Sequence, residues 1–168
     1  QKKVKGSFDI ARFWKHCIGT AVAARLIASY RREANIEKYF VMGLLHDIGR
    51  VVIMMIIPEY GVSTTKKAAE EERPLHLVEK EVLDFDHAQV GGELLRQWKL
   101  PGNLIDSISN HHYPSKSRDY YNDAALLHIS EIISNCLEVV RDHNVSVPDV
   151  EKGAWEAMGL PESMISSL

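Results

Sequence analysis

Apolar side chains recur at helical spacing along most of this chain of 168 residues. From Phe8 to Arg32 they lie three or four residues apart, which predicts a long amphipathic helix with Asp9 as a suitable N-cap. A nearly continuous apolar run follows from Tyr39 to Ile57 within an expected helix over Glu37–Ile57, which Pro58 ends. This run predicts a single central helix that is buried in the fold.

The rest of the chain predicts shorter helices separated by prolines and polar loops. Asp86 is a natural N-cap, and Gly91 and Gly92 in the helix after it indicate close packing of backbones. The expected ranges are Tyr60–Arg73, Leu75–Leu83, His87–Lys99, Pro101–His112, Ala124–Val140, Pro148–Met158 and Pro161–Leu168. No segment alternates with a period of two, so we expect an all-α bundle of about seven to nine helices in one domain, residues 1–168.

Within the central run, the stretch Gly43–Arg50 contains the polar residues His46, Asp47 and Arg50. Burying these groups costs several kcal/mol unless each has a partner or a metal. A membrane span is one alternative, since the run approaches the roughly 20 residues that cross a bilayer. However, Asp47 and Arg50 would each cost about 2.5–3.5 kcal/mol there, which cancels the gain from their apolar neighbours. We therefore favour a buried helix with His46 and Asp47, about 100° apart, turned toward a common polar site.

Composition narrows the class of protein. The net charge of −3 gives no electrostatic signature for binding nucleic acid or anionic lipid. Cys17 and Cys136 lie outside any CxxC pattern, which argues against disulfides and thiolate zinc sites. Residues 1–7 do not begin a signal peptide, so we expect a cytoplasmic protein. Because the sequence lacks an initial Met, we also expect it to be a fragment of a longer chain.

Several histidines have ordinary explanations when taken alone, because a histidine on an apolar helix face is more often a hydrogen-bonded core residue than a ligand. His128 and Glu131 lie three residues apart on one face and fit a simple hydrogen-bonded pair. His76 and His143 stand in polar surroundings, and we expect both at the surface.

Two adjacent pairs, His46–Asp47 and His111–His112, are harder to dismiss. Imidazole nitrogen and carboxylate oxygen suit divalent ions such as iron, manganese and zinc. Each pair alone is a weak signal, but together they belong to a series in which every member lies on or beside a different predicted helix. The series is His16, His46–Asp47, His87, His111–His112 and Glu131.

The order of this series resembles that of the HD superfamily of metal-dependent phosphohydrolases. Five segments resemble more closely the HDOD family, the HD-related output domains of bacterial signalling proteins: Phe13–His16, Gly43–Arg50, Asp86–Gly91, Trp98–Pro101 and Asn110–Pro114. The segment Ala154–Leu160 is similar to that family's ending. The resemblance covers nearly the whole chain and implies an HD-domain-like helical bundle, of which this sequence would be the C-terminal half.

The resemblance also implies a set of site residues. The metal positions of the HD superfamily match His16, His46, Asp47, His87, His111 and His112, and its closing Asp matches Glu131, whose side chain is one methylene longer. Arg50 stands where the related HD-GYP phosphodiesterases carry a phosphate-contacting Lys, and an Arg fork can serve that role. The GYP element is missing, since Pro58–Gly61 follows the central run, so hydrolysis of cyclic di-GMP is not expected.

Two functions stay open on these grounds. One is a regulatory output domain that contacts other signalling domains or proteins, or forms a homo-oligomer. The other is a phosphohydrolase acting on a phosphoester or nucleotide, with one or two iron, manganese, zinc or nickel ions bridged by Asp47, and with Arg50 neutralising phosphate charge. No organic cofactor is expected, and haem has no support beyond the histidines themselves.

Overall fold

The computed structural model describes residues 8–139, 149–151 and 153–161, and all regular secondary structure within these residues is helical. The helices are α1 (Ile10–Tyr30), α2 (Ile36–Leu45), α3 (Ile48–Ile56), α4 (Pro58–Glu70), α5 (Leu75–Leu83), α6 (His87–Gln97), α7 (Gly102–Ser109), a short 3₁₀ turn (Pro114–Lys116), α8 (Tyr121–Val139) and α9 (Ala154–Met158). The expected all-α fold is therefore confirmed. His143 and nearly all of the helix expected over Pro161–Leu168 lie outside the described residues.

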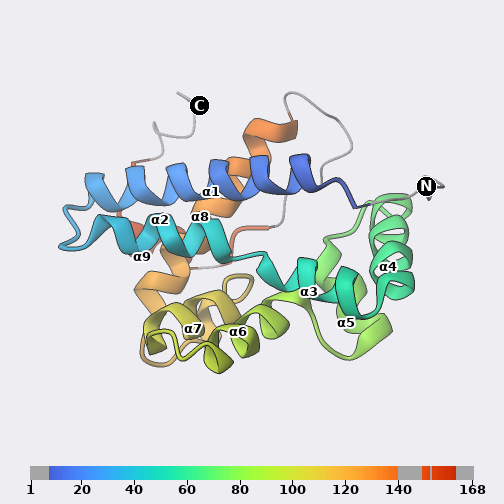
Figure 1. Ribbon diagram of the computed structural model, residues 1–168. Coiled ribbons are helices and arrows are strands. Elements are labelled where there is room, and N and C mark those ends of the chain that lie inside the picture. The colour runs from blue at the N-terminus through green and yellow to red at the C-terminus, as the bar shows by residue number, and fades with distance from the viewer. Residues whose placement is uncertain (1–7, 140–148, 152, 162–168) are drawn as a thin grey trace.

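Helices α1 and α2 form an antiparallel pair along one side of the molecule (Figure 1). Asp9 caps α1 as expected, because its carboxylate accepts the N–H groups of Ala11 and Arg12. The two helices approach closely, since a Cβ atom added to Gly43 would lie only 2.5 Å from the Cα atom of Ala21. Helix α8 packs against both of them, so the three helices form one tightly packed unit.

The single central helix expected from the sequence is wrong, because the structure contains two helices there. Helix α2 ends at Leu45, and α3 begins at Ile48 after a turn made by His46 and Asp47. Asp47 has φ −98° and ψ 8°, in the bridge region of the backbone map, which interrupts the run of helical hydrogen bonds. Apolar residues continue on both sides of the turn, so the spacing pattern does not reveal it.

Among the described residues, one segment, Ile36–Ile56, is long and apolar enough to cross a membrane by length and composition. The turn divides this segment near its middle, and the side chains of His46 and Asp47 are buried there against other helices. Buried polar groups at the centre favour a segment of a protein core over a membrane span.

Glycines allow α3 to cross α6 at backbone contact. A Cβ atom on Gly49 would lie 2.0 Å from the carbonyl oxygen of His87 and 2.7 Å from the backbone nitrogen of Gly91. Asp86 caps α6 as predicted, in a reciprocal capping box with Gln89. The crossing brings the first residue of α6 next to the turn that precedes α3.

The apolar core lies between α1, α2, α6, α7, α8 and α9. Helices α6 and α7 lie below the α1–α2 pair in the view of Figure 1, and α4 and α5 extend the molecule at one end. The largest fully buried side chains include Met42 of α2, Leu95 of α6, Ile108 of α7 and Leu126 of α8. These contacts hold together the helix ends that carry the polar interior.

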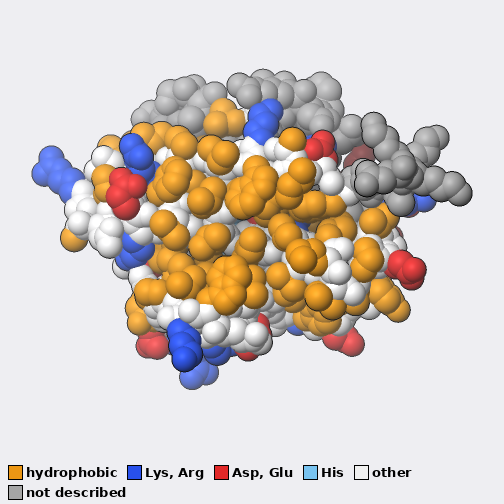
Figure 2. All heavy atoms as spheres, viewed as in Figure 1, with side chains coloured by type: hydrophobic (Ala, Val, Ile, Leu, Met, Phe, Trp, Pro, Cys, Tyr) orange, Lys and Arg blue, Asp and Glu red, His pale blue; other side chains and the backbone are white. Residues whose placement is uncertain are grey.

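Helix α1 also carries an apolar stripe on its outer surface. Its members repeat every four residues and are each 39–62% exposed: Ile10, Trp14, Ile18, Val22, Leu26 and Tyr30. Side chains at this spacing form a continuous ridge of the kind that packs into a groove of another helix. Figure 2, which shows the molecule from the side of α1, α2 and α3, displays a predominantly apolar face. Large exposed patches of this type mark surfaces for protein contacts.

We expect Gly49→Ala to destabilise the fold by at least about 2 kcal/mol, because the added methyl group would meet backbone atoms of α6 that cannot rotate away. Chemical denaturation followed by circular dichroism measures the change. Gly102→Ala is the matched control, since its new Cβ atom would have only ordinary contacts, the nearest at 3.7 Å. Equal stability of the two variants would contradict the proposed backbone crossing.

Candidate metal centre

All seven residues that the sequence proposes as metal ligands lie together in the interior. They come from α1, the turn between α2 and α3, the start of α6, the turn after α7, and α8. None is more than 7% exposed. They are His16, His46, Asp47, His87, His111, His112 and Glu131.

Asp47 lies at the centre of this cluster. Its Oδ1 atom is 3.1 Å from Nε2 of His87 and 3.5 Å from Nε2 of His46. Its Oδ2 atom is 3.8 Å from Nε2 of His16. The Nε2 atoms of His16 and His46 approach to 3.2 Å. One carboxylate thus contacts histidines from both sides of the cluster.

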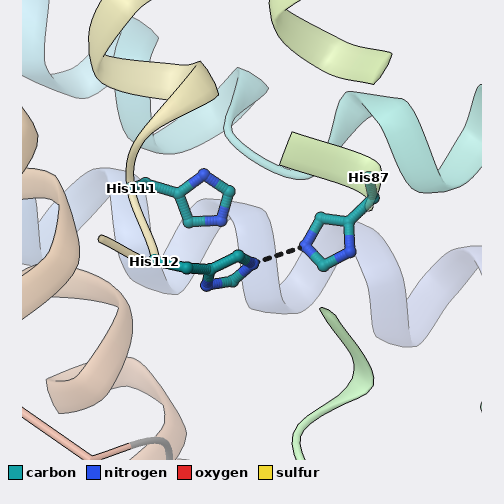
Figure 3. Close-up of side chains that lie close together, drawn as sticks. All are labelled: His87, His111 and His112. Carbon is teal, nitrogen blue, oxygen red and sulfur yellow. Dashed lines mark hydrogen bonds between the residues drawn. The ribbon is translucent and has the colours of Figure 1, made fainter. Parts of the chain in front are cut away.

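The second side of the cluster is made by His87, His111 and His112, whose rings lie close together between α6 and the turn after α7 (Figure 3). The Nε2 atoms of His87 and His112 are 2.9 Å apart. Glu131 of α8 adds a carboxylate, with Oε2 at 3.6 Å from Nδ1 of His112 and 3.8 Å from Nε2 of His111. The cluster therefore combines five imidazole groups with two carboxylates in the protein interior.

Hydrogen bonds on the outer side of the rings determine which nitrogen faces the cluster. Nδ1 of His46 lies 2.8 Å from the carbonyl oxygen of Gly43, and Nδ1 of His111 lies 2.7 Å from that of Ile108. Because a carbonyl oxygen only accepts, each Nδ1 carries the proton and each Nε2 presents a lone pair inward. Nδ1 of His87 likewise has an acceptor on its outer side, in this case a carboxylate.

The inward-facing atoms fit a divalent metal ion. Within the described part of the chain, no hydrogen bond reaches Oδ1 of Asp47, Nε2 of His111, Nδ1 of His112 or Oε2 of Glu131. Burying such an atom unpaired costs about 1–3 kcal/mol. Two nitrogens bound to one zinc ion at about 2.0–2.1 Å lie roughly 3.3 Å apart, and the closest ligand atoms of the cluster are separated by 2.9, 3.1 and 3.2 Å.

Three overlapping groups within the described residues have ligand atoms that lie within 4.8 Å of one another and can hold an ion. They are His16 with His46 and Glu131, His46 with Asp47 and His111, and His87 with His111 and His112. Such a mixture of imidazole and carboxylate suits the divalent transition metals, among them the iron, manganese, zinc and nickel ions expected from the sequence.

Burial keeps several of the imidazoles neutral. It lowers the pKa of His46 to about 4, and it lowers the pKa of His111 and of His112 well below the usual value. Burial would also lower the pKa of His87, but the carboxylates of Glu79 and Asp47 raise it well above its usual value. Neutral imidazoles with inward lone pairs are the protonation state that a metal ion requires.

The two carboxylates of the cluster differ in charge. Desolvation would raise the pKa of Asp47, yet His46, Arg50 and His87 together hold it well below its usual value. Desolvation and the nearby Asp47 raise the pKa of Glu131 to about 7. Asp47 is therefore the fixed negative charge of the cluster, whereas Glu131 changes charge near neutral pH.

Arg50 connects the cluster to its outer surface. Its Nη1 atom donates to Oδ2 of Asp47 at 2.8 Å. The Arg50 side chain is 27% exposed, compared with 3% for Asp47. Arg50 is thus the more exposed member of this ion pair.

Helix α5 brings two residues to the cluster that the sequence analysis missed. The prediction that His76 lies at the surface is wrong, since it is 6% exposed and its ring stacks on that of His112 with centroids 3.9 Å apart. Glu79, one turn later, is 2% exposed and contacts His87. Their spacing of three places both on one face of α5, which was the available signal, but the two apolar residues between them and the charged residues after Glu79 obscured it.

His128 has a structural role, and its hydrogen-bond partners differ from the expected Glu131. Its Nδ1 atom donates to the carbonyl oxygen of His111 at 2.8 Å, and its Nε2 atom accepts the N–H of Glu151 at 2.9 Å. The ring therefore ties the segment that precedes α9 to the turn that carries His111.

The fold and the cluster define a class of protein: an all-helical chain with a buried histidine–carboxylate site of the metal-binding type. The sequence pattern of the HDOD domain matches residues 1–114, and the chain belongs to the HDOD family. The matched range contains every candidate ligand except Glu131, which follows it together with the segment Ala154–Leu160.

The chain is also similar to bacterial proteins in sequence or in fold. The chain is 35% identical over 80 residues, 48% of its length, to an uncharacterized protein of Treponema pallidum (strain Nichols), of which the match covers 16%. An HDOD domain protein with unknown function from Geobacter sulfurreducens has the same fold, with a TM-score of 0.73 and 22% identity over 92% of this chain and 54% of the other.

Two further crystal structures share the fold. One, from Shewanella amazonensis SB2B, carries a provisional name as a phosphohydrolase; it has a TM-score of 0.70 and 25% identity over 95% of this chain and 62% of the other. The MmoQ response regulator of Methylococcus capsulatus has a TM-score of 0.67 and 23% identity over 95% of this chain and 61% of the other. The chain thus spans less than two thirds of the length of each relative.

We expect the metal-free protein to lose stability as the pH falls from 7.5 to 5.5. His46 and His76 each have a pKa of about 4 in the folded protein, against about 6.5 when unfolded. The unfolded state takes up the protons first, so the stability is present above pH 6.5 and is lost as the pH falls toward 4. These two rings account for about 2–3 kcal/mol over this interval, and the lowered pKa of His111 and of His112 acts in the same direction.

The raised pKa values of His87 and Glu131 oppose this loss of stability, but these two groups are fewer than the histidines whose pKa is lowered. Urea denaturation in the presence of a chelator, at both pH values, measures the balance. Equal or greater stability at pH 5.5 would show that the buried rings are not held neutral.

Proposed function

We propose that this protein is a regulatory output domain of a bacterial signalling system, and that its buried cluster holds one or two divalent metal ions. The observation that carries the proposal is the convergence of buried, unpartnered ligand atoms from distant parts of an HDOD chain. The Asp47 carboxylate would take part in metal binding on both sides of the cluster, because its Oδ1 atom lies near both His46 and His87.

Burial of the cluster supports a regulatory role. No ligand is more than 7% exposed, so a phosphoester has little access to the ligand atoms in this conformation. The apolar stripe of α1 supports a partner that is itself a protein, another domain or protein of the same signalling system (Figure 2). A response regulator has the same fold, and the relatives are bacterial, which supports a place in bacterial cytoplasmic signalling.

A second candidate function is metal-dependent hydrolysis of a phosphoester or nucleotide. Arg50 favours it, because the guanidinium group is held by Asp47 at 2.8 Å and is partly exposed. Arg50 would donate N–H groups to phosphate oxygens and offset the charge that develops on them. A bound ion would supply Lewis acidity and lower the pKa of a water molecule. The provisional name of the Shewanella protein is consistent with this alternative.

We expect protein purified without chelator or affinity metal to contain at least about one equivalent of a divalent transition metal, measured by inductively coupled plasma mass spectrometry. Asp47→Asn should lose most of this metal, because it removes the central negative charge while keeping the side chain's size. Asp119→Asn, in an exposed loop, is the control and should keep it. A folded wild-type protein that takes up no metal on dialysis would refute the metal centre.

Hydrolysis of bis(p-nitrophenyl) phosphate by manganese-loaded protein separates the two functions. As a regulatory domain, the protein should hydrolyse the ester no faster than its Arg50→Ala variant. Turnover that falls about 100-fold in Arg50→Ala, and that is unchanged in the exposed control Arg96→Ala, would instead establish the phosphohydrolase.

A further inference from the structure

Glu79 of α5 makes an unusual pair of contacts with a single residue. Its Oε2 atom accepts the backbone N–H of His87 at 2.9 Å and lies 2.6 Å from Nδ1 of the same histidine. Both side chains are almost fully buried, at 3% and 4% exposure. One carboxylate oxygen therefore contacts both the backbone and the ring of His87, and a short connection of residues 84–86 joins the two helices.

These contacts determine which nitrogen of the His87 ring carries a proton. A carboxylate accepts hydrogen bonds, so the short bond at Nδ1 places a proton there. Nε2 then faces Oδ1 of Asp47 at 3.1 Å and Nε2 of His112 at 2.9 Å. If Nε2 is free of a proton, these neighbours present lone pairs to one another, an arrangement that a shared cation stabilises.

Glu79 differs from the groups that orient the other rings. His46 and His111 use the carbonyl oxygens of Gly43 and Ile108, which are fixed parts of their own helices and carry no net charge. His87 differs from these two, because its outer nitrogen meets an acidic side chain from a different helix. A carboxylate behind a ligating imidazole makes the ring a stronger electron donor and holds its orientation.

We propose that Glu79 is a positioning residue of the metal centre, which fixes His87 with Nδ1 protonated and Nε2 directed at the ion. This inference rests on the metal centre proposed above. It gives α5, which supplies no ligand of its own, a defined part in metal affinity. It also explains why an acidic residue lies buried on that helix between apolar contacts, with its oxygen directed at the start of α6.

Glu79→Gln tests the proposal, because it keeps the size of the side chain and one acceptor oxygen but removes the charge. With zinc as the probe ion and a competing chelator, we expect its affinity to fall about 10- to 100-fold relative to wild type. Glu81→Gln is the matched control, since Glu81 lies on the same helix but pairs with Lys67 and Arg73 at the surface. It should bind zinc like the wild type. Equal affinity in a folded Glu79→Gln protein would overturn the inference.

A second measurement does not depend on metal. In ¹⁵N–¹H spectra of the metal-free protein, the Nδ1 proton of His87 should appear far downfield in the wild type and in Glu81→Gln, because of its short bond to a carboxylate. It should move upfield or vanish in Glu79→Gln. A wild-type protein that shows no proton on Nδ1 would overturn the inference even if Glu79→Gln fails to fold.

The two measurements also separate this inference from the metal centre itself. If the wild type binds no zinc but shows the downfield Nδ1 proton, the metal centre fails while the pairing of Glu79 with His87 stands. If the wild type binds zinc and Glu79→Gln binds it equally well, the metal centre stands and the role of Glu79 fails.

Discussion

The rest of this structure depends on the burial of a crowded cluster of ligand atoms, four of which have no hydrogen bond within the described residues. Imidazole nitrogens and carboxylate oxygens meet at 2.9–3.2 Å in the protein interior. Ring-to-ring hydrogen bonds join His16 to His46 and His87 to His112, but several of the other atoms have no hydrogen bond within the described residues. Each unpaired atom costs about 1–3 kcal/mol, which is large against the net stability of a domain. A core that retains such groups has a use for them, and a shared cation removes the conflict.

The fold meets this constraint by placing helix ends at the cluster. His46 and Asp47 form the turn between α2 and α3, and His87 is the first residue of α6. The pair His111–His112 follows the end of α7. Residues at helix ends have backbone freedom that mid-helix residues lack, so adjacent side chains can both turn inward. The backbone contact of Gly49 with α6 then sets how closely two of these ends approach.

The sequence was sufficient for the helical class, which depends on local spacing, and for the residues that come together in the cluster, which follow from motif order. It was not sufficient for the turn at Asp47, since apolar residues flank the turn on both sides. Helical periodicity shows on which face of a helix each residue lies, but not where the helix is interrupted. His76 was assigned to the surface from its sequence neighbours, but burial is decided by the helix face that meets α6 and the turn after α7. Glu79 was missed because its spacing from His76 shows a shared face of α5 but not the contact of that face with His87 of the next helix.

The two candidate functions use the same buried residues and differ in whether a substrate must reach these residues. For hydrolysis, a phosphate must approach past Arg50, whose side chain is 27% exposed, toward ligands that are almost wholly covered. For regulation, the cluster needs no access, because an ion that joins α1, α6, α8 and two turns changes how firmly these elements are held together. The apolar stripe lies on α1, the helix that also carries His16 on its buried face. In the proposed regulatory function, occupancy of the site would act on the exposed surface through this one helix.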